Sequence, residues 1–124
     1  MLVINKSNDR VEFEFLVDEI GTIHQAFNEV INGFRVDNFD QTIGLSKDLA
    51  KSEMNTLRDY YQNAKNENLS KIRREINLEL IHIYINVLKE VFKEIEEWEF
   101  HTRMGAQKKE AQKLLDSLQN AVAL

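Results

Sequence analysis

The sequence predicts an α+β fold that is predominantly helical, with four main helices and a small N-terminal β-hairpin or sheet. Two observations predict this class. Apolar residues near the N-terminus alternate with a period of two around a turn, whereas most of the remaining chain has the apolar spacing of amphipathic helices. A third observation predicts the organisation, because the helical pattern of the first half recurs 61 residues later. We therefore expect a single domain over residues 1–124, formed by tandem duplication of a (β)αα unit with pseudo-twofold packing.

The first predicted element is a hairpin. A turn-forming segment at residues 6–9, KSND, separates two short stretches in which every second residue is apolar. These apolar residues are Leu2 and Ile4 before the turn, and Val11, Phe13, Phe15 and Val17 after it. Period-two spacing places the apolar side chains of a strand on one face. The sequence therefore predicts strands near residues 2–5 and 10–16, with one buried face.

Two amphipathic helices follow in the first unit. The first has its apolar residues on one helical stripe, at Ile20, Ile23, Phe27, Val30, Ile31 and Phe34, and Gly33 lies where this helix could end. The second has its stripe at Ala50, Met54, Leu57, Tyr61 and Ala64. We expect it to begin near Ser46, whose hydroxyl is a suitable N-cap. The polar segment 62–70, QNAKNENLS, is the predicted connection between two units at about 10–62 and 71–124.

The second unit repeats the first in register. At a shift of 61 residues without gaps, the first stripe matches Ile81, Tyr84, Leu88, Val91, Phe92 and Ile95. The segment between the helices keeps the same shift, with Phe39 matching Phe100 and Gly44 matching Gly105. Eight of the 47 pairs between residues 17–63 and 78–124 are identical. The match in the interhelical segment distinguishes a duplication from chance, because any two amphipathic helices can be aligned on their stripes alone. The alternative is an ordinary four-helix pattern.

Residues 74–80, REINLEL, leave two alternatives open. Ile76, Leu78 and Leu80 alternate as in a strand and match part of the first unit's second strand. A helix that begins directly after Leu69 explains the same residues. The pattern does not decide between them.

Composition restricts the compartment. The chain contains no cysteine, which excludes disulfides and thiolate metal sites and fits a reducing compartment. Its first residues show no basic start followed by an apolar stretch, and no apolar run approaches the roughly 18 residues of a membrane helix. We therefore expect a cytoplasmic protein that does not bind membranes.

Charge restricts the partners. The net charge is −5, and residues 1–62 carry it, with six lysine and arginine residues against eleven acidic ones. Residues 63–124 have ten of each. Lys71, Arg73 and Arg74 form the one basic cluster, which Glu75 and Glu79 follow, and we interpret it as a solvated face. An acidic chain without a basic patch is not expected to bind nucleic acid.

No set of residues indicates a cofactor or a metal. Glu79 and His82 have the Glu-x-x-His spacing of carboxylate-bridged metal sites, but such sites need the motif twice. The matching positions in the first unit are Asp18 and Gly21, so the motif does not recur. We expect protein purified without added metal to contain no stoichiometric metal.

An enzymatic interpretation depends on His101. Glu97 lies four residues before it, and a base oriented by a carboxylate is conceivable. No serine stands in a Gly-x-Ser-x-Gly elbow that would supply a nucleophile. His24 is expected at the edge of the core. The sequence therefore favours a protein that is not an enzyme.

The two interhelical segments, GFRVDNFDQTIG and EIEEWEFHTRMG, contain the most unusual residues. We expect Phe39 and Phe100 to turn inward and attach each segment to the core. Trp98 has Asp37 as its match, and it is either a core residue of the second unit or an exposed interface anchor. Because segments between packed elements often carry function, we predict that both form the functional surface. The interface candidates are Trp98, His101, Arg103, Phe39 and Asp40.

Three hypotheses about function follow. The first is a non-catalytic protein-binding module of the inhibitor, immunity or adaptor type, in which the acidic first half attracts a basic partner. The second is a homodimeric structural or assembly protein. The third is a small hydrolase-like enzyme that uses His101 with Glu97 and Glu99.

Overall fold

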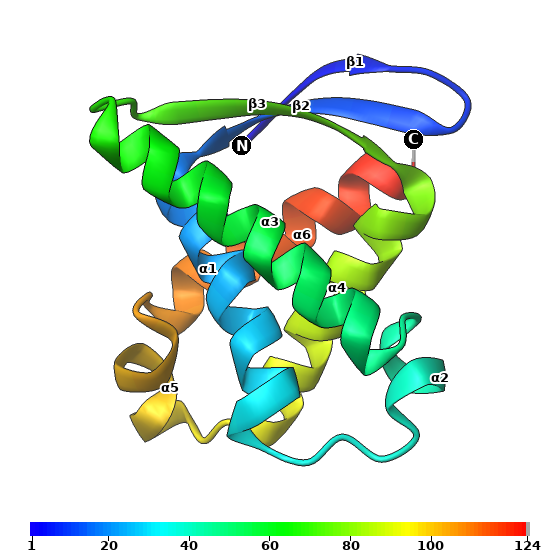
Figure 1. Cartoon of the computed structure of the whole chain (residues 1–124), viewed down its shortest axis with the longest axis vertical. Coiled ribbons are helices and arrows are strands. Elements are labelled where there is room, and N and C mark those ends of the chain that lie inside the picture. Colours follow the sequence, from blue (N-terminus) through cyan, green and yellow to red (C-terminus); the bar gives the residue numbers. More distant parts are fainter. Residues whose placement is uncertain (124) are drawn as a thin grey trace.

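The structure is a computed structural model that describes residues 1–123. Within these residues the chain forms an α+β fold with a three-stranded antiparallel sheet, six α-helices and one π-helical turn. The predicted class is confirmed. Figure 1 shows the sheet at one end of the molecule and the helices packed below it.

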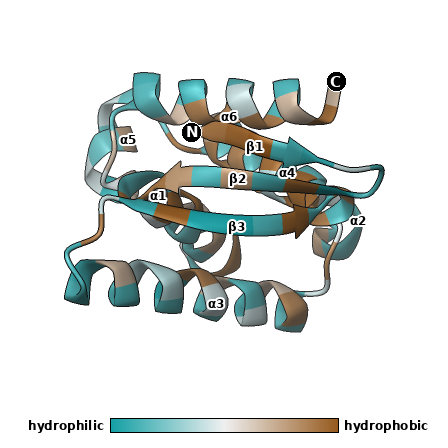
Figure 2. Cartoon of the chain, turned by 90° about the horizontal axis from the view of Figure 1, so that it is seen from above, coloured by the Kyte–Doolittle hydropathy of each residue, from teal (hydrophilic) through white to brown (hydrophobic). Residues whose placement is uncertain are grey.

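The sheet contains β1 (Leu2–Lys6), β2 (Arg10–Leu16) and β3 (Lys71–Asn77), in the order β1-β2-β3. The two strands predicted for the hairpin are confirmed, but the predicted burial of Leu2 and Ile4 is wrong, because both lie on the edge strand β1 and are 58% and 40% exposed. Figure 2 looks onto the face of the sheet that the helices leave uncovered. The opposite face meets the helices, and its apolar side chains are buried. They are Val11, Phe13 and Phe15 on β2 and Ile72 and Ile76 on β3.

Four long helical segments form the layer below the sheet. α1 (Val17–Asn28) continues into the π-helical turn η1 (Glu29–Gly33) and lies beside α4 (Leu78–Glu94) under the strands. α3 (Lys47–Asn66) runs along the β3 side and α6 (Lys108–Ala123) along the β1 side, as Figure 2 shows. The core lies between the sheet and these helices because their apolar stripes meet there.

The last long helix is α6 (Lys108–Ala123), and two short helices precede α3 and α6. They are α2 (Phe39–Ile43) and α5 (Glu97–Met104), at the end of the molecule away from the sheet (Figure 1). The sequence predicted loops here. Helices form because each segment has apolar residues four positions apart, Phe39 with Ile43 and Phe100 with Met104, that pack against the core. Gly44 and Gly105 end the two helices with positive φ, as a left-handed C-cap requires.

The structure decides between the two alternatives for residues 74–80, since a strand ends at Asn77 and a helix begins at Leu78. The Asn77 side chain accepts a hydrogen bond from the Leu80 amide at 2.8 Å and so caps α4. The predicted connection over 62–70 begins too early, because α3 continues to Asn66 and Ala64 is buried on it. At the start of α3, Ser46 is the predicted N-cap and accepts from the Leu49 amide at 3.2 Å.

Matching elements in the two halves have bounds that are 61 residues apart, which is the shift found in the sequence. β2 covers residues 10–16 and β3 covers 71–77, while α1 with η1 covers 17–33 and α4 covers 78–94. The register in which β2 pairs with β3 is also consistent with this shift. The pair Arg10↔Asn77 becomes Leu16↔Lys71 when each residue is replaced by its match, and Phe13↔Arg74 becomes itself. Superposition of the two halves by a twofold rotation remains a prediction.

Candidate functional site

Helix α5 presents an exposed tryptophan. Phe100 and Met104 turn inward and are buried, and the Phe100 ring stacks on Phe92 with the ring centroids 5.3 Å apart. Since these two residues hold one face of α5 against the core, Trp98, two positions before Phe100, lies on the opposite side of the helix and turns to solvent. Trp98 is 80% exposed. Of the two alternatives for Trp98, the structure agrees with the exposed side chain.

The surroundings of Trp98 are acidic. Glu94 at the end of α4, Glu96 before α5 and Glu97 on its first turn are exposed, and Glu94 forms an exposed ion pair with Lys93 at 3.9 Å. Glu99 is only half-buried and forms an ion pair with Arg103 at 3.5 Å. The surface around Trp98 therefore combines one large apolar side chain with negative charge. We call Trp98 with Glu94, Glu96 and Glu97 the α5 surface.

Arg103 binds inward. Its Nε donates a hydrogen bond to Oε1 of Glu29 at 2.8 Å, and a terminal nitrogen donates to the same oxygen. Glu29 is buried on η1, so the ion pair attaches α5 to the end of the first helical segment. A Cβ at Gly33 would lie only 2.5 Å from Glu29 Oε1, and glycine at this position leaves room for the carboxylate. The role visible for Arg103 is therefore to position α5.

The predicted interface residues do not lie together. Phe39 and Asp40 are on α2, and Figures 1 and 2 both show α2 and α5 on opposite sides of the molecule. Phe39 is half-buried against the core, with Lys47 Nζ 5.7 Å from its ring centroid. His101 is exposed on α5, and among residues 1–123 its side chain forms no hydrogen bond or ion pair. Trp98 and His101 share α5, whereas Phe39 and Asp40 form a separate group.

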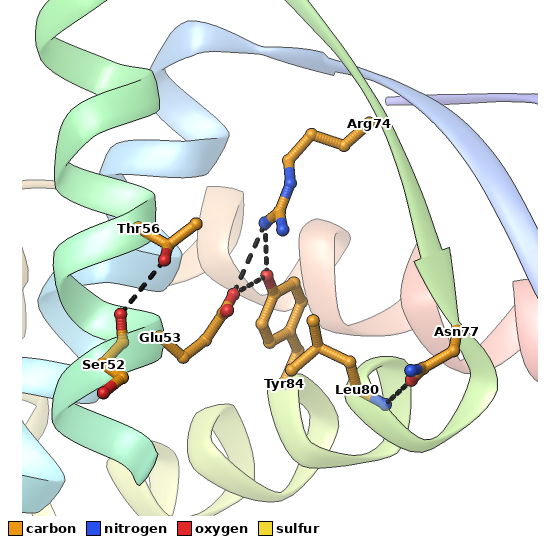
Figure 3. Close-up of polar contacts among 7 residues, drawn as sticks. All are labelled: Ser52, Glu53, Thr56, Arg74, Asn77, Leu80 and Tyr84. Atoms are coloured by element: carbon orange, nitrogen blue, oxygen red, sulfur yellow. Dashed lines mark hydrogen bonds and ion pairs between the residues drawn. The ribbon is translucent and has the colours of Figure 1, made fainter. Parts of the chain in front are cut away.

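A buried polar cluster escaped the sequence analysis (Figure 3). The hydroxyl of Tyr84 on α4 hydrogen-bonds Glu53 of α3, and Arg74 of β3 donates to the Tyr84 oxygen at 2.6 Å. Arg74 also pairs with Glu53 at 3.4 Å and lies over the Tyr60 ring, 4.6 Å from its centroid. The interpretation of the basic cluster as a solvated face is therefore wrong for Arg74, because its side chain is only 9% exposed. The alternation of β3 places Arg74 on the inward face between Ile72 and Ile76, which was the available signal.

The environment keeps Tyr84 protonated. Burial, and then the negative charge of Glu53, raise the pKa of the Tyr84 phenol well above its usual value of about 10. The matching residues in the other half are Ile23, Phe13 and Leu114, which are buried and apolar. Each member of the cluster has a partner inside it. We therefore assign the cluster to the joining of α3, α4 and β3.

A groove lies over α1, between α3 on one side and α6 with the α5–α6 turn on the other. Its volume is about 870 Å³. Gly21, Thr22 and His24 line it from α1, Tyr61 from α3 and Leu114 from α6. His24 is half-buried, as expected, and burial followed by the nearby charge of Arg58 lowers its pKa. The imidazole is therefore mainly neutral at neutral pH.

The matching position around α4 is filled. A Cβ at Gly44 would lie 3.3 Å from Cγ1 of Ile83, whereas a Cβ at Gly105 would meet no atom within 4 Å. Asn86 closes the same region by donating a hydrogen bond to the Ile43 carbonyl at 3.0 Å. Ile83 matches Thr22 in the first half. A smaller residue on α1 than at the matching position of α4 is thus the feature of the sequence that indicates the groove.

The described residues contain no evident metal site. No group of three or more histidine, aspartate or glutamate residues within 1–123 could hold an ion, and Glu79 and His82 are both exposed on α4. No helix in the same part of the chain is long and apolar enough to cross a membrane. The expectation of a metal-free protein remains a prediction.

Comparisons of the chain with models of protein families, with curated proteins and with solved structures found no match.

Proposed function

We propose that this protein is a non-catalytic protein-binding module of the inhibitor, immunity or adaptor type, and that the α5 surface is its main contact. The supporting observation is Trp98, which is 80% exposed on a helix that buried residues fix in place. Exposed tryptophans on rigid elements are costly to leave in water and are enriched among the residues that dominate binding energy. A fixed aromatic side chain also loses little conformational freedom when a partner binds.

The charge around Trp98 supports a basic partner. Glu94, Glu96 and Glu97 are exposed next to the indole, and the ion pair with Glu29 keeps Arg103 from presenting its charge to a partner. Complementary charge speeds association and selects the partner, while the buried aromatic side chain supplies affinity. We therefore expect the partner to present a pocket for the indole within a lysine- or arginine-rich surface. Its association should slow as salt concentration rises.

The test compares two truncations of exposed apolar side chains. Trp98→Ala should lower affinity for the partner by about 2 kcal/mol or more, roughly thirtyfold. Leu49→Ala is the control, because Leu49 is 58% exposed on α3, away from α5. A partner captured from the host extract by the wild-type protein and by Leu49→Ala, but lost with Trp98→Ala, is the expected result. Equal retention by all three proteins would exclude the α5 surface.

Self-association is the second candidate. It is supported by β1, an edge strand on which Leu2, Val3 and Ile4 are 58%, 42% and 40% exposed. Edge strands with exposed apolar residues pair readily with a second chain. Light scattering on the purified protein separates this homodimeric role from a monomeric module. A concentration-independent mass of one chain would remove it.

The duplication is also a proposal. We infer that an ancestral (β)αα unit was copied in tandem and that the copies pack about a pseudo-twofold axis through the pair Phe13↔Arg74. The 61-residue relation between element bounds and the self-matching register of β2 with β3 support this history. An experimental structure in which residues 17–63 superpose best on 78–124 at another offset would contradict it.

A further inference from the structure

We propose that the groove over α1 binds a small amphipathic carboxylate, with its apolar part against Tyr61 and Leu16 and its carboxylate beside Arg58. This site is separate from the α5 surface and does not depend on the protein-binding role. The groove is lined by one part of α1, the second half of α3, the α5–α6 turn and α6. Its volume of about 870 Å³ lies in the range of small-molecule sites.

The first argument is the shape of the apolar lining. Gly21 allows the Tyr61 ring to lie directly against α1, since a Cβ at this glycine would be 2.9 Å from Cε2 of Tyr61. The accessible aliphatic lining comes from Leu16, which is 46% exposed, and from the half-buried Met1 and Ala106. An aromatic ring together with accessible aliphatic side chains favours a flat or elongated apolar group in the groove.

The second argument is the charge of the groove. Each acidic side chain that lines it already has a partner: Asp18 pairs with Lys65 at 3.9 Å, Glu110 pairs with Lys113 at 3.7 Å, and Glu19 accepts from the Leu16 amide at 2.7 Å. Arg58 also lines the groove, and within residues 1–123 it forms no ion pair or hydrogen bond. The cation without a partner is thus Arg58, and guanidinium groups bind carboxylates through two parallel hydrogen bonds.

His24 makes the site suited to a single negative charge. His24 lines the groove near Arg58. Burial, and then the positive charge of Arg58, lower the pKa of His24. The neutral imidazole offers a hydrogen bond to the ligand and adds no second cation. We therefore expect a monocarboxylate to bind better than a dianion such as a phosphate monoester.

The matching region around α4 predicts the stoichiometry. Ile83 and Asn86 occupy it, and Gln119 stands there at the position that matches Arg58. Within the described residues this second region is narrowed by Ile83 and has no cation at the position that matches Arg58. Each chain should bind one ligand molecule.

The probe is 2-naphthylacetate, which combines a flat apolar ring system with one carboxylate, and binding is followed by two-dimensional amide NMR. We expect saturable binding of one molecule per chain, with the largest shifts at residues of α1, the end of α3 and the α5–α6 turn. Arg58→Gln, which installs the residue found at the matching position, should weaken binding about tenfold or more. Lys51→Gln removes the same charge from an exposed position of α3 outside the groove and should leave the Kd unchanged.

The neutral analogue 2-naphthylethanol tests the chemical class. It should bind the wild-type protein about as weakly as the acid binds Arg58→Gln. Equal binding of the alcohol and the acid would show that the carboxylate is not recognised and would overturn the proposal. Absence of saturation up to about 5 mM probe, shifts centred outside the groove, or equal effects of Arg58→Gln and Lys51→Gln would overturn it as well.

Discussion

The two halves of the chain share one succession of elements and differ in what they place at matching positions. Around α4, Ile83 and Asn86 fill the space next to Gly44, whereas around α1 the smaller Thr22 leaves a groove next to Gly105. At the centre of the sheet, Phe13 of β2 is apolar and its match Arg74 of β3 belongs to a buried polar cluster. Some residues that differ between the halves line the groove to which we assign ligand binding, whereas others, such as Arg74, join α3, α4 and β3.

The two short helices show the same contrast. α2 and α5 each attach to the core through a phenylalanine, and each ends at a glycine with positive φ. Only α5 presents an exposed tryptophan, because Asp37 stands at the matching position before α2. Only α5 has the ion pair of Arg103 with Glu29. The ion pair attaches α5 to the first helical segment, but an 80% exposed indole contributes little to folding, which is why we place the protein contact on α5.

The largest expected effect separates the two faces of α5. Phe100→Ala should lower the free energy of unfolding by about 3 to 5 kcal/mol, because Phe100 is fully buried and its truncation leaves a cavity. Trp98→Ala should change it by less than about 0.5 kcal/mol, because Trp98 is 80% exposed. Urea denaturation of both variants measures the difference. A large loss for Trp98→Ala would show that the indole is a core residue and would remove it from the proposed contact.

The fold was largely predictable from the sequence because its signals are local. Period-two and 3.6-residue spacing located both strands of the hairpin and the long helices, and the hydroxyl of Ser46 marked the start of α3. Two short helices were predicted as loops because their apolar residues are few and stand among charged ones. The boundary at Asn77 was missed because the alternation of residues 74–80 fits a strand and the start of a helix equally well.

The site was less predictable because its features depend on contacts between distant segments. Trp98 was correctly singled out as unusual, but its exposure follows from the way Phe100 and Met104 orient α5. Arg103 was expected at the surface, and its pairing with Glu29 joins residues 74 positions apart. The groove depends on Gly21, Tyr61 and Leu114, which come from three helices. No spacing within a single helix shows such a juxtaposition.

The next effect tests the polar half of the sheet. Tyr84→Phe should cost about 1 to 2 kcal/mol near neutral pH, because it removes hydrogen bonds with Glu53 and Arg74 while those two residues stay paired. The folded-state pKa of Tyr84 is raised, so its contribution is complete below about pH 10 and falls above it, where the unfolded chain loses the phenol proton first.

Urea denaturation at several pH values between about 8 and 11 measures this dependence. The difference in unfolding free energy between the wild-type protein and Tyr84→Phe should shrink as pH rises through that range. Tyr60→Phe is the control, because Tyr60 lies at the surface and its hydroxyl forms no hydrogen bond within the described residues. A difference that stays constant with pH would contradict the raised pKa.

The smallest expected difference, about 1 kcal/mol, is that between Gly44→Ala in the filled region and Gly105→Ala beside the groove. Gly105→Ala should cost about 1 kcal/mol, because φ is 67° and an L-residue is strained there, although the added methyl group meets no atom within 4 Å. Gly44→Ala should cost about 1 kcal/mol more, because its φ is 98° and the methyl group would also press on Ile83 at 3.3 Å. Thermal and urea denaturation of the two variants measure this inequality. The double variant Gly44→Ala with Ile83→Ala separates the two causes, because it removes Cγ1 of Ile83, so the cost of Gly44→Ala measured against Ile83→Ala alone should contain only the strain. Equal costs for the two single variants would mean that the region around α4 is no more tightly filled than the groove around α1.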